Sequence, residues 1–310
     1  MRKVIGIGET ILDIIFKDNS PCRAVPGGTV FNGMVSLSRM GVSTTFISEL
    51  GNDQVGNIIA SFMKENNLPT DFIDRYPDGK SPVALAFLDE KQNAGYMVFK
   101  DYPAQRLEVS YPQINEDDIF ILGSYYALNP ALRSRVVEFL RYAQERKAII
   151  YYDPNFRKPH ADEALRLRPD VLENFEFADI VRGSDEDFSL LFGKTDMQEI
   201  YDEYVSFHCS NLIVTHAAEG ADLYMRRQPK EHFDAPVIQP VSTIGAGDNF
   251  NAGLIYGMLK YNIRRNDLPT LSRADWEPII NCGMAFAANV CLTFDNYISL
   301  SFADEYRRLS

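Results

Sequence analysis

The segment Thr243-Ile244-Gly245-Ala246-Gly247-Asp248, which runs directly into residues 249–260 (NFNAGLIYGMLK), is the most informative stretch of this chain. Glycines on both sides of an alanine let the backbone turn tightly, and apolar residues at helical spacing follow at once. Such a loop can direct several backbone N–H groups toward one point, where the helix dipole adds positive potential. The segment therefore predicts an anion-binding site that needs no lysine or arginine.

Asp248 is unexpected beside an anion site, because its carboxylate repels the ligand that the loop attracts. A carboxylate beside a reacting hydroxyl can accept the hydroxyl proton during phosphoryl transfer, which makes Asp248 a candidate general base. The residues alone also allow a plain glycine-rich turn in which Asp248 caps the following helix. Both interpretations stay open at this point.

Around this segment, strand-like and helix-like stretches alternate along the chain. The expected strands are residues 4–8, 44–50, 119–122, 148–152, 180–181 and 212–215. The expected helices include residues 31–40, 55–65, 132–144, 171–175, 186–192, 248–260 and 278–293. This rhythm predicts an α/β fold with a mostly parallel sheet and helices on both faces. Residues 83–88 and 96–99, joined by the polar turn 89–95, interrupt it and predict a hairpin outside that sheet.

Composition and charge exclude several classes of protein. The chain has 310 residues, of which 45% are hydrophobic and 24% charged, so it is globular and not disordered. The net charge of −12 argues against a nucleic-acid partner, which requires a basic surface. No apolar run approaches the ~18 residues of a membrane span. An anionic ligand must therefore be bound by local features.

Cysteine and histidine positions indicate neither a disulfide framework nor a zinc site. The cysteines show no CxxC spacing and the histidines are scattered; they are Cys22, Cys209, Cys282, Cys291, His160, His208, His216 and His232. Glu9 and Asp13 interrupt the apolar run near the N-terminus, which argues against a signal peptide. These features predict a cytoplasmic protein with reduced thiols.

Two shorter motifs do not fit the nucleotide-binding sites that they suggest. Gly6-Ile7-Gly8 follows a strand, but Ile11 stands where a dinucleotide fingerprint has its third glycine. Gly79-Lys80-Ser81 ends like a phosphate-binding loop, but it lacks the first glycine and leads into the expected hairpin.

The 243–248 segment resembles the second signature of the PfkB (ribokinase-like) carbohydrate kinases, whose usual form is Asp-Thr-x-Gly-Ala-Gly-Asp. The first signature of that family is similar to residues 26–32 (PGGTVFN), 37–41 (LSRMG) and 51–56 (GNDQVG). Residues 153–157 (DPNFR) resemble a run found in the fructokinase and 2-keto-3-deoxygluconate kinase branch. Ordered signatures in both halves of a chain are far more specific than either alone.

The resemblance implies one ribokinase-like kinase domain over residues 1–310. Its fold would be a three-layer α/β/α arrangement with a mostly parallel central sheet and a small β-sheet lid, formed by excursions around residues 12–26 and 72–108. Its activity would be the ATP-dependent phosphorylation of a hydroxyl of a small sugar or sugar acid, with ATP and Mg²⁺ as cofactors.

The resemblance also assigns roles to individual residues. Asp248 would be the general base, and Gly245, Ala246 and Gly247 would form the anion hole. The implied substrate-binding residues are Asp13, Gly27, Gly28, Asn32 and Arg157. The implied nucleotide-binding residues are Thr215, Gly220 and Ser184, and Asp187 would act on Mg²⁺ through water. The residues alone also allow a turn role for Asp13, a helix-start role for Asn32 and a surface ion pair for Arg157.

Several positions depart from the family pattern. Ser242 replaces the first aspartate of the second signature, which helps to bind an activating potassium ion in several members, so a role for K⁺ is doubtful here. Ser184 and Asp187 replace the Asn and Glu of N-x-x-E, and Ala217 replaces a glycine of T-x-G-x-x-G. Residues 100–106 (KDYPAQR) stand where many members have Tyr-Arg followed by Ala-Asp, so the sugar cannot be inferred.

Two other functions remain open from the sequence: a nucleoside kinase on the same scaffold, and a non-catalytic sugar- or nucleotide-sensing protein. The expected partners are a small-molecule sugar and ATP, with no nucleic acid and no membrane. The expected hairpin leaves an apolar face that a second subunit could cover, which predicts a homodimer through the lid. The residues predicted to form that face are Val83, Leu85, Phe87 and Val98.

Overall fold

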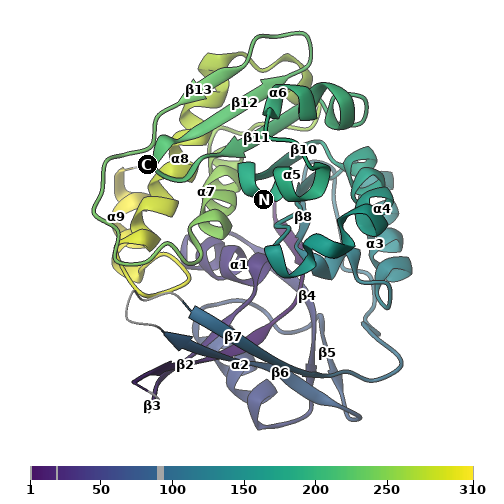
Figure 1. Ribbon diagram of the computed structural model, residues 1–310, viewed down its shortest axis with the longest axis vertical. Helices are drawn as coiled ribbons and strands as arrows, with labels where there is room; N and C mark the ends of the chain where they lie inside the picture. The colour runs from purple at the N-terminus through teal and green to yellow at the C-terminus, as the bar shows by residue number, and fades with distance from the viewer. Residues whose placement is uncertain (1, 19, 89–93, 310) are drawn as a thin grey trace.

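A nine-stranded sheet forms the centre of the computed structural model, which describes residues 2–18, 20–88 and 94–309 (Figure 1). Its strand order is β13-β12-β11-β10-β9-β8-β1-β4-β5. The strands are β1 (Val4–Ile7), β4 (Thr44–Gly51), β5 (Ile73–Tyr76), β8 (Ile119–Gly123), β9 (Ile149–Asp153), β10 (Ile180–Ser184), β11 (Asn211–Thr215), β12 (Ala221–Met225) and β13 (Glu231–Phe233). Only the β11–β12 and β12–β13 pairs are antiparallel, which confirms a mostly parallel sheet.

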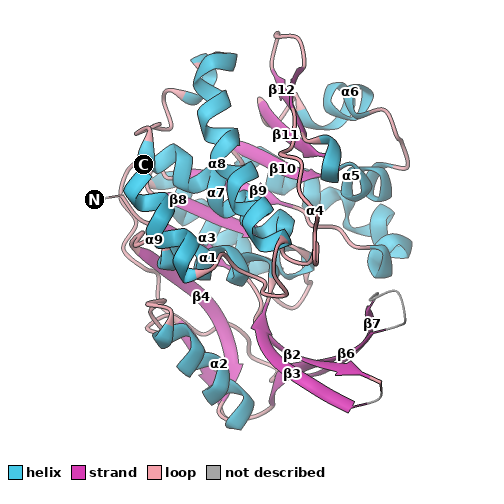
Figure 2. Cartoon of the chain, turned by 90° about the vertical axis from the view of Figure 1, so that its left-hand side faces the viewer, coloured by secondary structure: helices cyan, strands magenta, loops and turns pink. Residues whose placement is uncertain are grey.

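Helices cover both faces of this sheet, because alternate strand residues enter two separate cores. On β8, Ile119 and Ile121 belong to one core, and Phe120 and Leu122 to the other. The first core is covered by α1 (Thr29–Arg39), α7 (Ala246–Lys260), α8 (Arg273–Cys291) and α9 (Leu300–Leu309). The second is covered by α3 (Arg133–Glu145), α4 (Ala164–Phe177) and α5 (Asp185–Phe192). The predicted three-layer α/β/α fold is confirmed (Figures 1 and 2).

A second, four-stranded sheet, here called the lid sheet, lies apart from the main sheet (Figure 2). Its order is β3-β2-β6-β7, with β2 (Ile11–Lys17), β3 (Ser20–Gly27), β6 (Lys80–Leu88) and β7 (Ala94–Asp101). The antiparallel β6–β7 pair confirms the predicted hairpin, although residues 89–93 of its turn lie outside the described residues. Helix α2 (Gln54–Glu65) packs against the lid sheet.

One expectation about the lid sheet is wrong. Val98 pairs with Ala84, so it points to the opposite side of the sheet from Val83, Leu85 and Phe87. The side chains that share the face of those three residues on β7 are Met97 and Phe99, which pair with Leu85 and Val83.

Several helices, α7 and α8 among them, begin earlier than their apolar patterns indicated. Helix α8 starts at Arg273 and not at residue 278, because Ser272 and Asp275 form a capping box ahead of the apolar run. Helix α7 starts at Ala246, so part of the expected glycine loop is already helical. No helix in the described part of the chain is long and apolar enough to cross a membrane.

Close contacts at glycines bring α1, α7 and α8 together. A Cβ atom on Gly253 of α7 would lie 2.3 Å from the carbonyl oxygen of Cys282 in α8. A Cβ on Gly33 of α1 would lie 3.1 Å from the carbonyl oxygen of Asp248. The absence of these side chains therefore sets the position of the start of α7 relative to α1 and α8.

Replacing Gly253 with alanine is expected to destabilise the protein by about 1–3 kcal/mol, because the new methyl group must push two helix backbones apart. Urea unfolding followed by circular dichroism measures the change. The control is Gly257→Ala in the same helix, where the nearest atom is 3.0 Å from the new Cβ and the loss should be smaller. Equal stability of wild type and Gly253→Ala would contradict this packing argument.

Candidate active site

The start of α7 has the geometry of an anion site. Gly245 is the residue before the helix and has a φ of 78°, a left-handed conformation that favours glycine. Ala246, Gly247 and Asp248 form the first turn, where backbone N–H groups have no carbonyl partner within the helix. The N–H of Ala246 donates to the carbonyl oxygen of Thr243, just before the helix, at 3.2 Å. The predicted Gly245–Gly247 loop is thus a turn that becomes a helix N-terminus.

Asp248 is buried at this helix start and does not cap the helix. Its Oδ2 accepts a hydrogen bond from Nδ2 of Asn32 on α1, at 2.8 Å. Burial raises the pKa of the Asp248 carboxyl to about 7, although Asn32, Arg157 and Arg182 act in the opposite direction. The structure therefore excludes the capping interpretation and gives a carboxyl group that titrates near neutral pH.

The other predicted sugar-binding residues surround one small space beside Asn32. A Cβ atom on Gly27 would lie 2.9 Å from Oδ2 of Asp13 and 3.9 Å from Oδ1 of Asn32. Gly28 has a φ of 140°, and a Cβ there would lie 2.3 Å from the carbonyl oxygen of Glu9, so only glycine fits. The fold therefore brings Asp13 together with Gly27 and Asn32, which come from two separate parts of the chain.

Two acceptor groups in this space, the Asp13 carboxyl and Oδ1 of Asn32, receive no hydrogen bond from the residues that the structure describes. Oδ1 of Asn32 is buried and has no hydrogen-bond partner among the described residues. Burial also raises the pKa of the Asp13 carboxyl to about 6. Buried polar atoms in proteins are nearly always hydrogen-bonded, so unpaired acceptors here indicate a space meant for a ligand that carries hydroxyl or amine donors.

Arg157 lies at the edge of the same site. It follows β9, and its Nε donates a hydrogen bond to Oδ1 of Asn155 at 2.9 Å. The Arg157 side chain is exposed, but it is close enough to lower the pKa of Asp248. No described carboxylate forms an ion pair with Arg157, so its positive charge is available to an anionic ligand.

Arg182 is a residue that sequence reasoning missed. It lies on β10, and a Cβ on Gly247 would be 2.9 Å from its Nη1, so the guanidinium lies against the start of α7. Nη1 donates to Asp153 Oδ2 at 2.9 Å and Nη2 to Thr215 Oγ1 at 2.6 Å. The sequence did hold an indication, because an arginine directly after the apolar pair 180–181 is unusual in a buried strand.

The pKa of Arg182 keeps this group charged. Burial alone would lower its pKa, but Asp153, Tyr151 and Asp187 raise it above the ordinary value. Asp153 also accepts a hydrogen bond from Asn251 Nδ2 at 2.6 Å. A fixed cation thus lies behind the candidate anion site, between β9, β10 and α7.

The predicted nucleotide-side residues lie at the ends of neighbouring strands. Ser184 ends β10 directly opposite Thr215 at the end of β11. Ser184 and Asp187 form a capping box at the start of α5, so Asp187 Oδ2 already accepts the Ser184 Oγ and N hydrogens. Burial and the nearby Asp153 raise the pKa of Asp187. Gly220, with a φ of 109°, shapes the turn between β11 and β12.

Metal-binding groups are sparse around these residues. Over residues 2–18, 20–88 and 94–309, no group of three or more His, Cys, Asp or Glu side chains is suited to hold a metal ion. Asp187 is a single, partly engaged carboxylate. This donor set suits an ion that is mainly held by phosphate oxygens and water, as Mg²⁺ with a nucleotide is.

Known proteins share this fold and sequence pattern. The chain is 29% identical over 272 residues to a probable chloroplastic fructokinase-6 of Arabidopsis thaliana, covering 81% of this chain and 69% of that protein. A fructokinase of Vibrio cholerae, solved with fructose, ADP and a potassium ion, superimposes with a TM-score of 0.83 at 20% identity, covering 97% and 95%. An aminoimidazole riboside kinase of Salmonella enterica superimposes with a TM-score of 0.80 at 24% identity, covering 99% of both chains.

Residues 1–301, nearly the whole chain, match the family described as pfkB family carbohydrate kinase. That match includes both the glycine pair next to Asn32 and the Gly245–Asp248 turn, which the fold brings to one place. From the folded arrangement and the match together, we conclude that this chain belongs to the pfkB family of carbohydrate kinases.

Proposed function

We propose that this carbohydrate kinase transfers the γ-phosphoryl group of ATP to a hydroxyl of a small sugar or sugar acid, as a fructokinase does. The observation that carries this proposal is the Asp248 carboxyl, which titrates near pH 7, touches Asn32 and lies at a helix N-terminus. The similarity to fructokinases supports the substrate class. The whole chain acts as one kinase domain, with the lid sheet closing over the sugar.

The proposed mechanism assigns a step to each part of the site. Asp13, Gly27, Gly28 and Asn32 hold the sugar, whose hydroxyl groups donate to the unpaired oxygens of Asp13 and Asn32. Asp248 takes the proton of the attacking sugar hydroxyl. At the same time, the hydroxyl oxygen forms a bond to the γ-phosphorus, in line with the bond to the leaving ADP that breaks.

Charge that develops on the transferring group is stabilised in place. The N–H groups of Gly245, Ala246 and Gly247 form the anion hole, and Arg182 adds a fixed positive charge behind Gly247. Arg157 faces the phosphates or the substrate from the rim. These groups are already positioned, so little reorganisation is needed during the reaction.

On the nucleotide side, Thr215, Gly220 and Ser184 contact ATP in this proposal, and Asp187 acts on Mg²⁺ through water. Mg²⁺ supplies electrostatic stabilisation of the phosphate charge. Ser242 offers a neutral hydroxyl, which accepts the backbone N–H of Ile244 at 3.2 Å, where the family pattern has a carboxylate. We therefore propose that turnover does not depend on K⁺.

An ADP-release assay across fructose, 2-keto-3-deoxygluconate, ribose, tagatose-type phosphates and nucleosides tests the proposed function. We expect ATP turnover to rise strongly with one sugar or sugar acid, and to be the same in potassium and tetramethylammonium chloride. Preferential turnover of a nucleoside would favour the nucleoside kinase instead. If no acceptor stimulates ADP release, the proposal fails and a non-catalytic sensing role is favoured.

Replacing Asp248 with asparagine should lower kcat by about 10²–10⁴-fold, because the general base is lost while the side chain keeps its shape. In wild type, kcat/KM for the sugar should rise with pH through about 7 and then stay level, since the base works only when ionised. Steady-state kinetics between pH 5.5 and 9 measure both.

The control for this variant is its free energy of unfolding, which shows whether Asp248→Asn is still stably folded. Folding raises the pKa of Asp248, so the native state holds this proton more tightly than the unfolded chain and loses stability as pH rises toward 7. At pH 8 the variant should therefore be at least as stable as wild type. Turnover near the wild-type rate would rule out Asp248 as the base.

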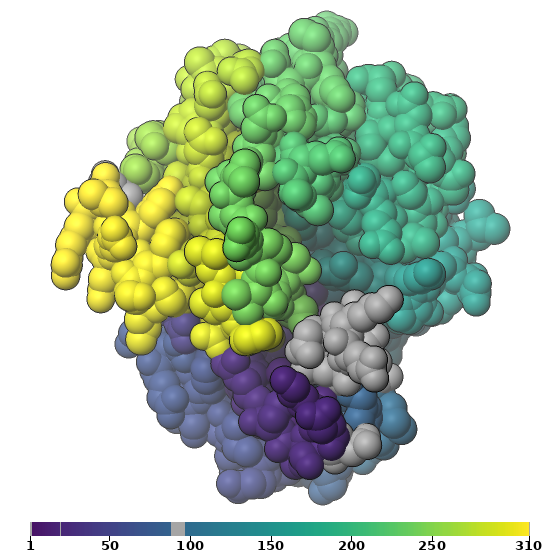
Figure 3. Space-filling view, turned by 60° about the vertical axis from the view of Figure 1, so that its left-hand side comes forward, coloured from purple at the N-terminus to yellow at the C-terminus, as the bar shows by residue number. Residues whose placement is uncertain are grey.

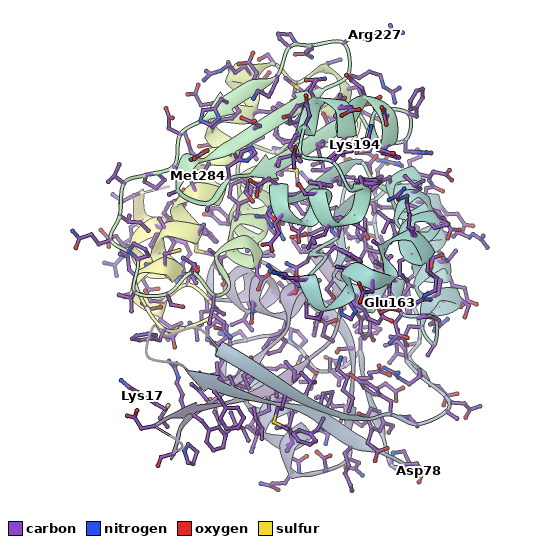
Figure 4. The ribbon with its side chains drawn as sticks, viewed as in Figure 1. Lys17, Asp78, Glu163, Lys194, Arg227 and Met284 are labelled. Atoms are coloured by element: carbon purple, nitrogen blue, oxygen red, sulfur yellow. The ribbon has the colours of Figure 1, made fainter. Side chains whose placement is uncertain are left out.

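The lid sheet also supports the proposed homodimer. Phe87, Met97 and Phe99, on the face that points away from Asp13, are 37%, 55% and 54% exposed. This face extends toward the free end of β2, where Figure 4 labels Lys17, away from the main sheet. An apolar face of this kind is better covered than left in water, and a second copy of the chain presents a matching one.

The double variant Met97→Glu/Phe99→Glu is expected to be monomeric, because two buried charges per subunit would have no partners. Sedimentation velocity compares it with wild type, which should be a dimer. The control is Phe207→Glu, which changes another exposed phenylalanine outside the lid sheet and should leave the dimer intact. A monomeric wild-type protein would refute the proposed dimer.

A further inference from the structure

The segment between α8 and α9, residues 292–299, returns to the candidate active site from the end of the chain. Asn296 in this segment is only 8% exposed. Its backbone oxygen accepts a hydrogen bond from Asn249 Nδ2 at 2.8 Å, and it would lie 2.9 Å from a Cβ on Gly245. The backbone of Asn296 is therefore part of the wall of the anion-site turn.

The side chain of Asn296 reaches the sugar-binding space on the other side. Its Nδ2 lies 3.4 Å from the position that a Cβ atom on Gly27 would occupy. Asp13 Oδ2 and Asn32 Oδ1 lie 2.9 Å and 3.9 Å from that same position. Within the described part of the chain, no residue forms a hydrogen bond with this side-chain amide. Three unpaired polar groups thus surround one point.

The segment that carries Asn296 is held firmly on both sides. The N–H of Ile298 donates to Ser36 Oγ at 3.1 Å, and Arg39 Nη1 donates to the Ile298 oxygen at 2.6 Å. Asp295 forms an ion pair with Arg23 of the lid strand β3. Figure 3 shows this C-terminal segment against the N-terminal lid strands. The Asn296 amide is consequently positioned before a ligand arrives, and binding need not order it.

The unpaired oxygens of Asp13 and Asn32 supply no hydrogen-bond donor for the hydroxyl oxygens of a sugar. Each sugar hydroxyl can donate one hydrogen bond and accept others. An ionised Asp13 and the Asn32 oxygen can only accept, so a donor to a hydroxyl oxygen must come from another side chain or from the backbone. Nδ2 of Asn296 is a donor, is unpaired and faces the same space.

We propose that Asn296 is a sugar-binding residue that determines specificity: its side-chain Nδ2 donates a hydrogen bond to one hydroxyl oxygen of the acceptor. This inference rests on the proposed kinase function. This hydrogen bond contributes to sugar binding and not to the chemical step, because the hydroxyl that it contacts is not the one that receives the phosphoryl group. Removal of such a bond raises KM and leaves kcat nearly unchanged.

The variant Asn296→Ala tests this, with the sugar of highest kcat/KM in the acceptor panel, for which D-fructose is the expected probe. KM for the sugar should rise about 2- to 12-fold, the range of one neutral hydrogen bond, with kcat and KM for ATP within about twofold. Asn296→Asp should raise the sugar KM further, since a second carboxylate would stand beside Asp13.

Monodeoxy analogues of the same sugar separate binding from a purely structural effect. Wild type should discriminate against the analogue that lacks the contacted hydroxyl, and Asn296→Ala should lose that discrimination for this analogue alone. The control is Ser299→Ala in the same segment, whose Oγ accepts the Phe302 N–H and does not touch the sugar space. Its sugar KM should match that of wild type.

Unchanged sugar KM in Asn296→Ala, or unchanged discrimination among all analogues, would overturn this inference while leaving the kinase function intact. A KM increase of the same size in Ser299→Ala would also overturn it, because the effect would then come from the segment as a whole. Absence of acceptor-stimulated turnover in wild type would instead refute the proposed function, and the inference with it.

Discussion

The close packing of α1, α7 and α8 is the constraint on which the candidate site depends. Because Gly33 and Gly253 carry no side chains, the α7 backbone approaches both neighbouring helices directly. This approach buries the Asp248 carboxyl against Asn32, and burial is the main reason that its pKa rises to about 7. A carboxyl left in water at the same sequence position would remain an ordinary acid and a weaker base.

Although the chain is acidic, we propose that it binds ATP through positive electrostatic potential at the start of α7. The net charge of −12 belongs to the whole surface. At the site, the start of α7 presents N–H groups and the helix dipole, and Arg182 stands buried behind Gly247. Asp153 holds that arginine in place and keeps it charged, so a buried acidic residue supports the cationic side of the site.

Much of the fold and part of the site could be predicted from the sequence, because their patterns are local. The alternation of apolar strands and helices predicted a mostly parallel sheet, and the glycine turn before Asp248 predicted a helix N-terminus. Strands β5, β12 and β13 and helix α9 were not predicted; the two edge strands, β5 and β13, are only four and three residues long. The prediction that Val98 shares a face with Val83 was wrong, because the pairing register of the hairpin decides which face of the sheet each side chain is on.

The sequence by itself determined the residue types that can do the chemistry: the glycine turn, Asp248, Asp13 and the Gly27-Gly28 pair before Asn32. Only the tertiary structure decided which of their neighbours take part. Arg182 and Asn296 have no motif around them, and they reach the site because β10 and the segment after α8 converge on α7. Such convergence depends on packing between distant parts of the chain, which no local pattern records.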